Sequence, residues 1–253
     1  MNKLTVGYSA LADRVAGIKP PSGPFDLLLV VQSANATNWQ EKLPNALKDS
    51  AVTDELKSLG VAKSRNRVIE LAKTDYLVFA DDDIEFVDAG LNEVIDYLDA
   101  NPDIALLLAQ ATDPSGKLRK TYPSSEQPLT KLNSARAATY EMVIRVSAIK
   151  ELGIRFDENF GAGVENYLGD EYIFIADLLS AGGKGVFLPI TIATHPEVSS
   201  GSGWGSDRDR RARAKVFTRV FGALAPVVRL AFGLRRLGLL GGLGNLMRFV
   251  VGR

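Results

Sequence analysis

The chain of 253 residues contains no cysteine and only one histidine. Without cysteine it has no disulfide framework, no thiolate metal site and no cysteine nucleophile. The first residues also lack the apolar segment that a signal peptide requires, and Asp13 adds an acid there. These absences predict a cytoplasmic protein that folds in a reducing environment.

Acidic residues are absent after Asp209, although the whole chain has 30 acids and 30 bases. Residues 1–209 contain 20 bases and carry a net charge of −10, whereas residues 210–253 carry +10. We therefore expect two parts, a body over residues 1–200 and a basic amphipathic helical tail over residues 201–253. A basic, apolar tail on an acidic body indicates that the tail meets an anionic surface.

The body alternates apolar runs typical of strands with segments of helical periodicity. With 46% hydrophobic and 24% charged residues, its composition excludes global disorder. The predicted strands are residues 4–9, 25–32, 75–80, 104–111 and 185–194, and the last is one bent strand or two short ones. The predicted helices are residues 12–18, 39–47, 61–73, 91–98 and 170–181, with a loop-rich segment at 112–134. This order predicts an α/β fold with a mostly parallel sheet, whose ligands bind at the carboxyl ends of the strands.

Three consecutive carboxylates, Asp81, Asp82 and Asp83, follow the predicted strand at residues 75–80. Adjacent carboxylates repel one another unless a cation or hydrogen-bond donors relieve the repulsion. Oxygen ligands of this kind suit Mg²⁺ or Mn²⁺, which can also hold a diphosphate. An acidic, solvated turn that caps the following helix is an equally good interpretation of the triplet alone.

A basic segment from Gly60 to Arg67 begins the helix that leads into this strand. Gly60 permits a close approach, Ser64 can cap the helix, and Lys63 and Arg65 can neutralise a phosphate near a helix N-terminus. The alternative interpretation is an ordinary basic helix start.

A glycine-rich loop precedes Asp170 and Glu171, which open an apolar helix. The helix dipole favours carboxylates in a first turn, and this explains them without any catalytic role. The functional alternative is a general base held at the mouth of a cleft. His195, followed by Pro196 at a strand end, is a structural histidine or a ligand by the same kind of argument.

Together, in this order, these four features resemble glycosyltransferase family 2, the inverting, nucleotide-sugar-dependent enzymes of the GT-A fold. Residues 60–66 match the family's Gly-x-x-x-Ser-Arg-Asn stretch, and Asp81 and Asp83 match its Asp-x-Asp motif. Residues 156–185 look like its acceptor loop and Glu-Asp helix, with His195 and Pro196 after it. The resemblance covers about residues 3–200 and implies a Rossmann-like, mostly parallel sheet flanked by helices.

The resemblance also implies a role for each matching residue. Asp81 would contact the ribose, Asp83 would hold the divalent metal with Asp82 as an alternative ligand, and Arg65 would approach the diphosphate or the base. Glu171 falls on the family's catalytic base, but the pair reads Asp-Glu here, which leaves Asp170 as an alternative. The complete set of expected nucleotide, metal and acceptor residues is Tyr8, Ser9, Gln32, Arg65, Asp81 and Asp82 for the nucleotide, Asp83, Asp81 and His195 for the metal, and Gly161, Gly163 and Tyr167 for the acceptor.

The expected reaction is therefore a metal-assisted transfer of a sugar, with Mn²⁺ or Mg²⁺ as the cofactor, to a hydroxyl of a lipid-linked or cell-surface glycan. A UDP-sugar is the favoured donor. GDP- and dTDP-sugars are alternatives, because Gln32 stands where the family usually has an acid that holds uracil. Two other hypotheses remain. One is a non-catalytic sugar-nucleotide-binding or membrane-scaffolding subunit of the same fold, and the other is a phosphoryl- or nucleotidyl-transferring enzyme, although the chain lacks a P-loop.

The tail after residue 209 places large apolar side chains between its ten bases. This density of apolar side chains fits the headgroup–acyl boundary of an anionic membrane better than a nucleic-acid groove. We expect peripheral attachment to the inner face of the membrane and no nucleic-acid partner. The alternatives are that the tail packs on the acidic body or forms a homodimer. The longest charge-free run, Leu237–Met247, is too short to cross a bilayer.

Overall fold

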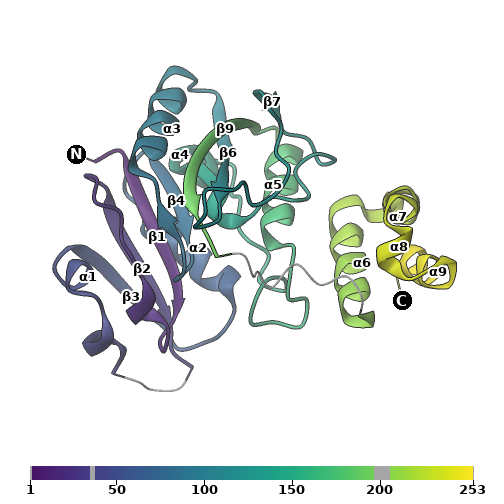
Figure 1. Cartoon of the computed structure of the whole chain (residues 1–253), viewed down its shortest axis with the longest axis horizontal. Helices are drawn as coiled ribbons and strands as arrows, with labels where there is room; N and C mark the ends of the chain where they lie inside the picture. The colour runs from purple at the N-terminus through teal and green to yellow at the C-terminus, as the bar shows by residue number, and fades with distance from the viewer. Residues whose placement is uncertain (1, 35–37, 197–205, 253) are drawn as a thin grey trace.

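The computed structural model describes residues 2–34, 38–196 and 206–252. Within them, a nine-stranded mixed sheet forms the body, in the order β3-β2-β1-β4-β8-β6-β9-β5, with β7 paired to β9 (Figure 1). The strands are β1 (Leu4–Leu11), β2 (Asp26–Gln32), β3 (Ala51–Leu56), β4 (Tyr76–Ala80), β5 (Glu85–Phe86), β6 (Ile104–Thr112), β7 (Gln127–Pro128), β8 (Met142–Arg145) and β9 (Lys184–Thr194). The expected α/β class with a mostly parallel central sheet is confirmed, since β3, β2, β1 and β4 are mutually parallel.

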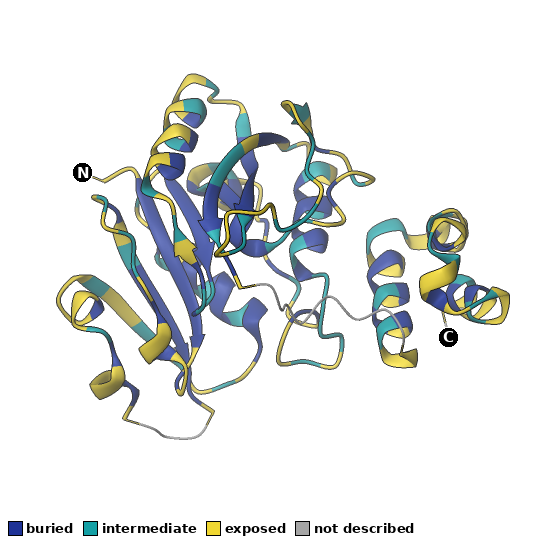
Figure 2. Ribbon diagram, in the orientation of Figure 1, coloured by how far each residue is buried: buried dark blue, intermediate teal, exposed yellow. Residues whose placement is uncertain are grey.

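Helices cover both faces of the sheet because alternate residues of each strand point to opposite sides. Tyr8 and Val31 belong to one buried cluster with side chains of α1 (Asn45–Ser50) and α3 (Asp88–Ala100). Val30 and Phe79 belong to a second cluster with α2 (Val61–Leu71), α4 (Val146–Glu151) and α5 (Asp170–Ser180). The two clusters make a three-layer body, and Figure 2 shows the central strands buried while the helices around them are partly exposed.

Two of the predicted helices are wrong, and four strands, β3, β5, β7 and β8, were not predicted. The expected helix at residues 12–18 is only the 3₁₀ turn Val15–Gly17, and the helix at 39–47 is divided by Pro44 into the 3₁₀ turn Trp39–Lys42 and α1. Both β3, which is largely exposed at the sheet edge, and the four-residue β8 lacked a continuous apolar run. The segment at 185–194 is a single strand, β9, whose pairing with β6 is irregular between Leu108 and Gln110.

The tail folds into four helices with a small core of its own. They are α6 (Asp207–Phe221), α7 (Ala225–Arg235), α8 (Leu237–Leu240) and α9 (Leu243–Val251), joined after α6 by the 3₁₀ turn Gly222–Leu224. Phe217 of α6 lies 5.0 Å from Phe232 of α7 and 5.8 Å from Phe249 of α9, measured between ring centroids. The predicted boundary after residue 200 lies outside the described residues.

Two residues set the ends of α6. Ser206 caps its start, because the Ser206 hydroxyl accepts a hydrogen bond from the Asp209 backbone N–H at 3.1 Å. Gly222 ends the helix with a φ of +53°, which only glycine adopts readily, and Pro226 fits the first turn of α7. By length and composition alone, the helical stretch Asp207–Arg235 could cross a membrane.

α6 attaches the tail to the body along α5. Val216 of α6 packs with Phe160 and Ile173 in a buried apolar cluster between the two helices. Arg219 forms ion pairs with Asp157 at 2.9 Å and Asp177 at 2.7 Å. The alternative in which the tail packs on the acidic body therefore describes α6.

Candidate active site

Strands β1, β2 and β4 bring their carboxyl ends to one edge of the sheet. Several of the expected nucleotide residues lie at or near this edge. Tyr8 pairs with Ala80 in the parallel register of β1 and β4, so Ser9 lies level with Asp81. Ser9 is buried, and among the described residues its hydroxyl has no hydrogen-bond partner. A buried, unpartnered hydroxyl beside a carboxylate is suited to a polar ligand.

Asp82, the middle carboxylate of the triplet, is buried and forms an ion pair with Arg14. The Arg14 Nη2 lies 2.6 Å from Asp82 Oδ1 and 3.6 Å from Asp83 Oδ2. Burial raises the pKa of Asp82 to about 6, because the charged form loses hydration, and Arg14 opposes this shift. The sequence analysis did not single out Arg14, which follows β1 by three residues.

Asp83 faces His195, with 3.7 Å between Asp83 Oδ1 and His195 Nε2. The other ring nitrogen, Nδ1, lies 2.5 Å from the Pro196 carbonyl oxygen, which can only accept, so Nδ1 carries a proton. Tyr140 stacks on the imidazole ring with 4.9 Å between centroids. In the neutral imidazole, Nε2 is then an acceptor facing a carboxylate, which is the arrangement that a cation between them stabilises.

These two side chains suit a divalent cation that also binds a diphosphate. Mg²⁺ is usually held by one or two protein ligands together with substrate phosphates and water. In the part of the chain that the structure describes, no group of three or more histidine and carboxylate side chains is arranged to hold a metal alone. Asp83 and His195 therefore fit a metal whose remaining ligands come from the substrate.

Arg65 of α2 is buried and connects two carboxylates that are far apart in the sequence. Its Nη1 donates to Asp170 Oδ2 at 2.5 Å, and its Nη2 donates to Asp81 Oδ1 at 3.1 Å. Phe156 lies under the guanidinium, 5.7 Å from the ring centroid. The nearby carboxylates raise the pKa of Arg65 further above its usual range in spite of burial, so it stays charged. Among the described residues its Nε has no partner.

Asp170 and Glu171 occupy the first turn of α5 but have different surroundings. Asp170 is buried and held by Arg65, whereas Glu171 is only partly covered. Burial, together with the charge and hydrogen bond of Asp170, raises the pKa of Glu171 well above its usual value, and Arg65 opposes the shift. A carboxyl group with a raised pKa beside a carboxylate that is engaged in an ion pair is typical of a general acid–base site.

The glycine-rich loop lies directly against these groups. Gly161 has φ +98°, and a Cβ there would lie 2.8 Å from Asp170 Cγ. Gly163 has φ +91°, and a Cβ there would lie 2.9 Å from the Gly60 nitrogen. The Val61 N–H donates to the Ala162 carbonyl at 2.9 Å, which fastens the loop to the start of α2. Both glycines are therefore required for the approach of the loop to α2 and α5.

Three expected site residues make contacts inside the protein. Gln32 is buried, accepts from the Gly60 N–H at 2.8 Å and donates to Ser64 at 3.2 Å. Tyr8 is buried and donates to the Lys19 carbonyl at 3.4 Å. Tyr167 donates to Asp209 of α6, and its ring lies 4.4 Å from the Arg208 guanidinium. The structure thus brings Asp81, Asp170 and Glu171 together through Arg65, while Tyr167 joins the body to the tail.

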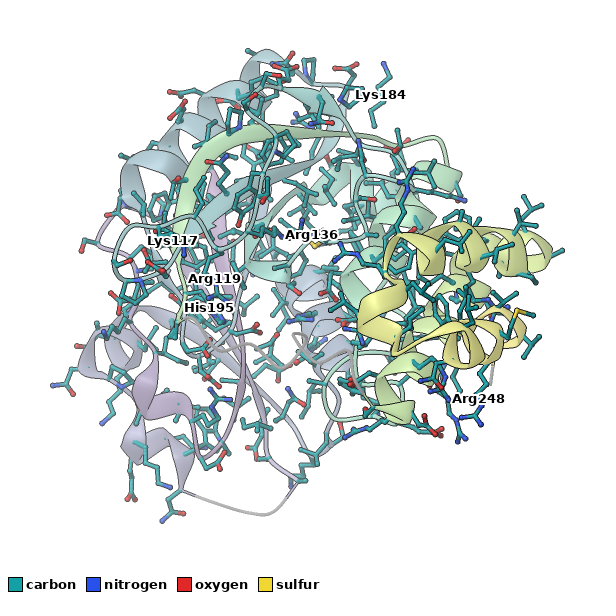
Figure 3. All side chains as sticks on the ribbon, turned by 45° about the vertical axis from the view of Figure 1, so that its right-hand side comes forward. Lys117, Arg119, Arg136, Lys184, His195 and Arg248 are labelled. Carbon is teal, nitrogen blue, oxygen red and sulfur yellow. The ribbon has the colours of Figure 1, made fainter. Side chains whose placement is uncertain are left out.

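A cavity of about 420 Å³ lies beside the acidic triplet, between the turn after β1 and the start of β5. Asp13, Arg14, Asp82, Asp83 and Pro196 are among its lining residues. Arg119, also not singled out from the sequence, lies close to His195 in Figure 3, and a hydrogen bond joins it to Tyr140. Its Nε is buried without a partner in the described segments. Its position inside the loop-rich segment at 112–134 offered no signal in the sequence.

Comparison with known proteins identifies one matching family. Residues 40–153 match the family model described as glycosyl transferase family 2. No curated protein matches the chain in sequence.

Solved structures of S. aureus TarS resemble the fold. TarS 1–349 in complex with UDP-GlcNAc has a TM-score of 0.60 and 15% identity, over 98% of this chain and 81% of that chain. The complex of TarS 1–349 with UDP has a TM-score of 0.56 and 16% identity over the same shares. A longer TarS structure is matched over 93% of this chain but only 43% of its own length, with a TM-score of 0.56 and 16% identity. At these identities the likeness shows the GT-A fold.

Proposed function

From the match of residues 40–153 to glycosyl transferase family 2, we propose that this glycosyltransferase uses a nucleotide sugar and inverts the sugar's anomeric centre while transferring it from a UDP-sugar to a hydroxyl group. The observation that carries the proposal is the position of Arg65 between Asp81 and Asp170. The buried Arg65 guanidinium thereby joins the edge of the sheet that suits a nucleotide to the carboxylates that suit an acceptor. UDP is favoured because two of the similar structures are complexes with UDP and UDP-GlcNAc.

On the donor side, Asp81 accepts hydrogen bonds from the ribose, and Ser9 lies level with it. Asp83 and His195 would hold Mn²⁺ or Mg²⁺, with Asp82 as the neighbouring carboxylate. When bound, the cation neutralises negative charge on the leaving diphosphate. Arg65, with a free Nε in the described part of the chain, adds a fixed positive charge on the same side.

On the acceptor side, Glu171 is the general base and Asp170 positions it. Glu171 removes the proton of the acceptor hydroxyl as its oxygen attacks the anomeric carbon, and the bond to the diphosphate breaks with its electron pair leaving on the nucleotide. Attack from the face opposite the leaving group inverts the centre. Asp170 is already engaged by Arg65, which leaves Glu171, with its raised pKa, as the carboxylate better able to accept a proton.

The first test is a screen of UDP-, GDP- and dTDP-sugars for binding and for release of nucleoside diphosphate, with and without Mn²⁺ or Mg²⁺. We expect metal-dependent binding of a UDP-sugar and, with an acceptor glycan, release of UDP. Release of pyrophosphate or a nucleoside monophosphate would instead show a phosphoryl or nucleotidyl transfer.

The second test separates catalysis from binding. Glu171→Gln should keep donor affinity and lose about 10²- to 10⁴-fold in kcat, the usual effect of removing a general base. Glu165→Gln changes an exposed position of the glycine-rich loop that precedes α5. It is the matched control and should keep full activity. NMR of the product gives the anomeric configuration, and retention would exclude the inverting mechanism.

A further inference from the structure

The tail presents an apolar surface outward as well as inward. On α7 the exposed positions fall on one side of the helix and, apart from Arg235 at its end, are apolar: Pro226, Val227, Leu230, Ala231 and Leu234. Those of α9 fall on one side too: Leu243, Gly244, Met247 and Val251, with Arg248 at its edge. A helix on a globular protein normally exposes its polar side. α7 and α9 instead expose an apolar side.

This exposed apolar surface does not result from poor packing, because both helices also bury apolar side chains on their inner side. Leu246 and Phe249 are buried in the core of the tail, and a Cβ on Gly233 of α7 would lie 2.4 Å from Leu246. All four phenylalanines of α6, α7 and α9 belong to that core, while Leu230, Leu234 and Met247 are 41%, 55% and 56% exposed. We define the outward side chains of α7–α9, with the exposed Leu239 of α8, as the outer face.

Positive charge borders the outer face. Arg235 at the end of α7 and Arg248 on α9 are exposed, and no acid follows Asp209 in the whole chain. Figure 3 shows Arg248 at the outer edge of the tail, far from His195 in the body. On α6, by contrast, the exposed positions are polar and include Arg211, Lys215 and Arg219. Apolar and basic side chains alone are what an anionic lipid surface attracts.

We propose that the outer face inserts into the headgroup–acyl boundary of an anionic membrane, with the tail lying on the bilayer rather than crossing it. Its exposed apolar side chains are aliphatic and carry no hydrogen-bonding groups, whereas protein interfaces are enriched in aromatic residues and surrounded by polar groups of both signs. Crossing would require the stretch Asp207–Arg235 to be straight, but it bends at Gly222 and α6 is fastened to α5.

One contact between α6 and the body lies next to the candidate active site. A Cβ on Gly169, the residue before Asp170, would lie 2.6 Å from Val216 of α6. The helix that joins the tail to the body thus packs on the first turn of the helix that carries Glu171. If the proposed function holds, an acceptor carried on a membrane lipid is presented to that turn.

The absence of cysteine allows a direct test in the full-length chain. Single variants Leu230→Cys and Met247→Cys, labelled with an environment-sensitive fluorophore, should show a blue shift with vesicles of phosphatidylcholine and 30% phosphatidylglycerol, and little with phosphatidylcholine alone. Val52→Cys, exposed on the body, should show none with either. No shift at Leu230 and Met247 with anionic vesicles would overturn the proposal.

Co-sedimentation gives the second readout and needs neither donor nor metal, so it is independent of catalysis. The combined variant Leu230→Gln, Leu234→Gln and Met247→Gln should bind anionic vesicles about tenfold or more weakly. The matched control is Val52→Gln, Leu118→Gln and Leu132→Gln, which changes three exposed apolar positions of the body and should bind like the parent. Equal binding by the tail variant, or a vesicle-independent dimer that this variant dissociates, would overturn the proposal.

Discussion

The Arg65 guanidinium donates to Asp170 across 105 positions of sequence, and the distance between Nη1 and Oδ2 is 2.5 Å. The same guanidinium reaches Asp81, so its planar shape serves two carboxylates at once. A lysine has one charged atom and cannot bridge both. We therefore expect the activity of this site to depend on a guanidinium at position 65.

We expect Arg65→Lys to lower kcat/KM about 100-fold or more, because the donor and acceptor sides lose their common fixed group. Steady-state kinetics with the identified donor measure the effect. Arg67→Lys is the matched control, since Arg67 lies on the same helix, is partly exposed and pairs with Asp54 and Glu70. Similar kinetics for the two variants would remove Arg65 from the mechanism.

The pH dependence of kcat/KM should report Glu171. Its raised pKa places the acidic limb of the profile above the usual range of a glutamate, because the protonated form cannot act as a base. In Asp170→Asn the neighbouring negative charge is gone and Arg65 is free to face Glu171, and both changes lower that pKa. The acidic limb should therefore move to lower pH, whatever happens to the maximal rate. A limb that stays in place would argue against Glu171 as the base.

Gly161 tests how closely the acceptor loop must approach Asp170. Gly161→Ala adds a Cβ that lies 2.8 Å from both Asp170 Cγ and Val61 Cγ1, at a φ of +98°. We expect loss of most activity and about 1–3 kcal/mol of stability from the strain and the collision. Gly182→Ala shares the positive φ, +85°, but meets no atom within 4 Å, so it should lose stability without losing activity.

Continuous apolar runs made the centre of the fold predictable. Strands β1, β2, β4, β6 and β9 are buried along most of their length, and each produces such a run. Edge strand β3 is largely exposed and has the mixed sequence AVTDEL, without an apolar run, and β8 is too short to produce a pattern. The periodicity of α2 and α5 was also readable, which placed Arg65 and Asp170 at helix starts.

Contacts across the chain were not predictable from local pattern. The pairing of Arg14 with Asp82 depends on the register of β1 against β4, and nothing near Arg14 in the sequence marks it. The tail's amphipathicity was visible, but not that α6 would pack apolar side chains on the body while α7 and α9 would expose apolar side chains on their outer side. Tyr167 was expected at the acceptor, yet its hydroxyl is taken by Asp209.

Arg14 occupies the position of a cation beside Asp82 and Asp83, and this leads to the last prediction. A metal that binds Asp83 competes with the guanidinium, whose side chain is 53% exposed and can move away. Arg14→Met should therefore bind Mn²⁺ about two- to fivefold more tightly without nucleotide, since an exposed ion pair is worth at most about 1 kcal/mol. Electron paramagnetic resonance of free Mn²⁺ measures the affinity directly.

The control must separate this contact from the general effect of removing a positive charge. Lys19 lines the same cavity but pairs with Glu85, so Lys19→Met removes one charge without freeing Asp82 or Asp83. If Mn²⁺ affinity rises equally in both variants, the effect is one of long-range charge alone, and if it rises in neither, Asp83 is not a metal ligand. A rise confined to Arg14→Met would show that the guanidinium holds the carboxylates in the absence of the metal.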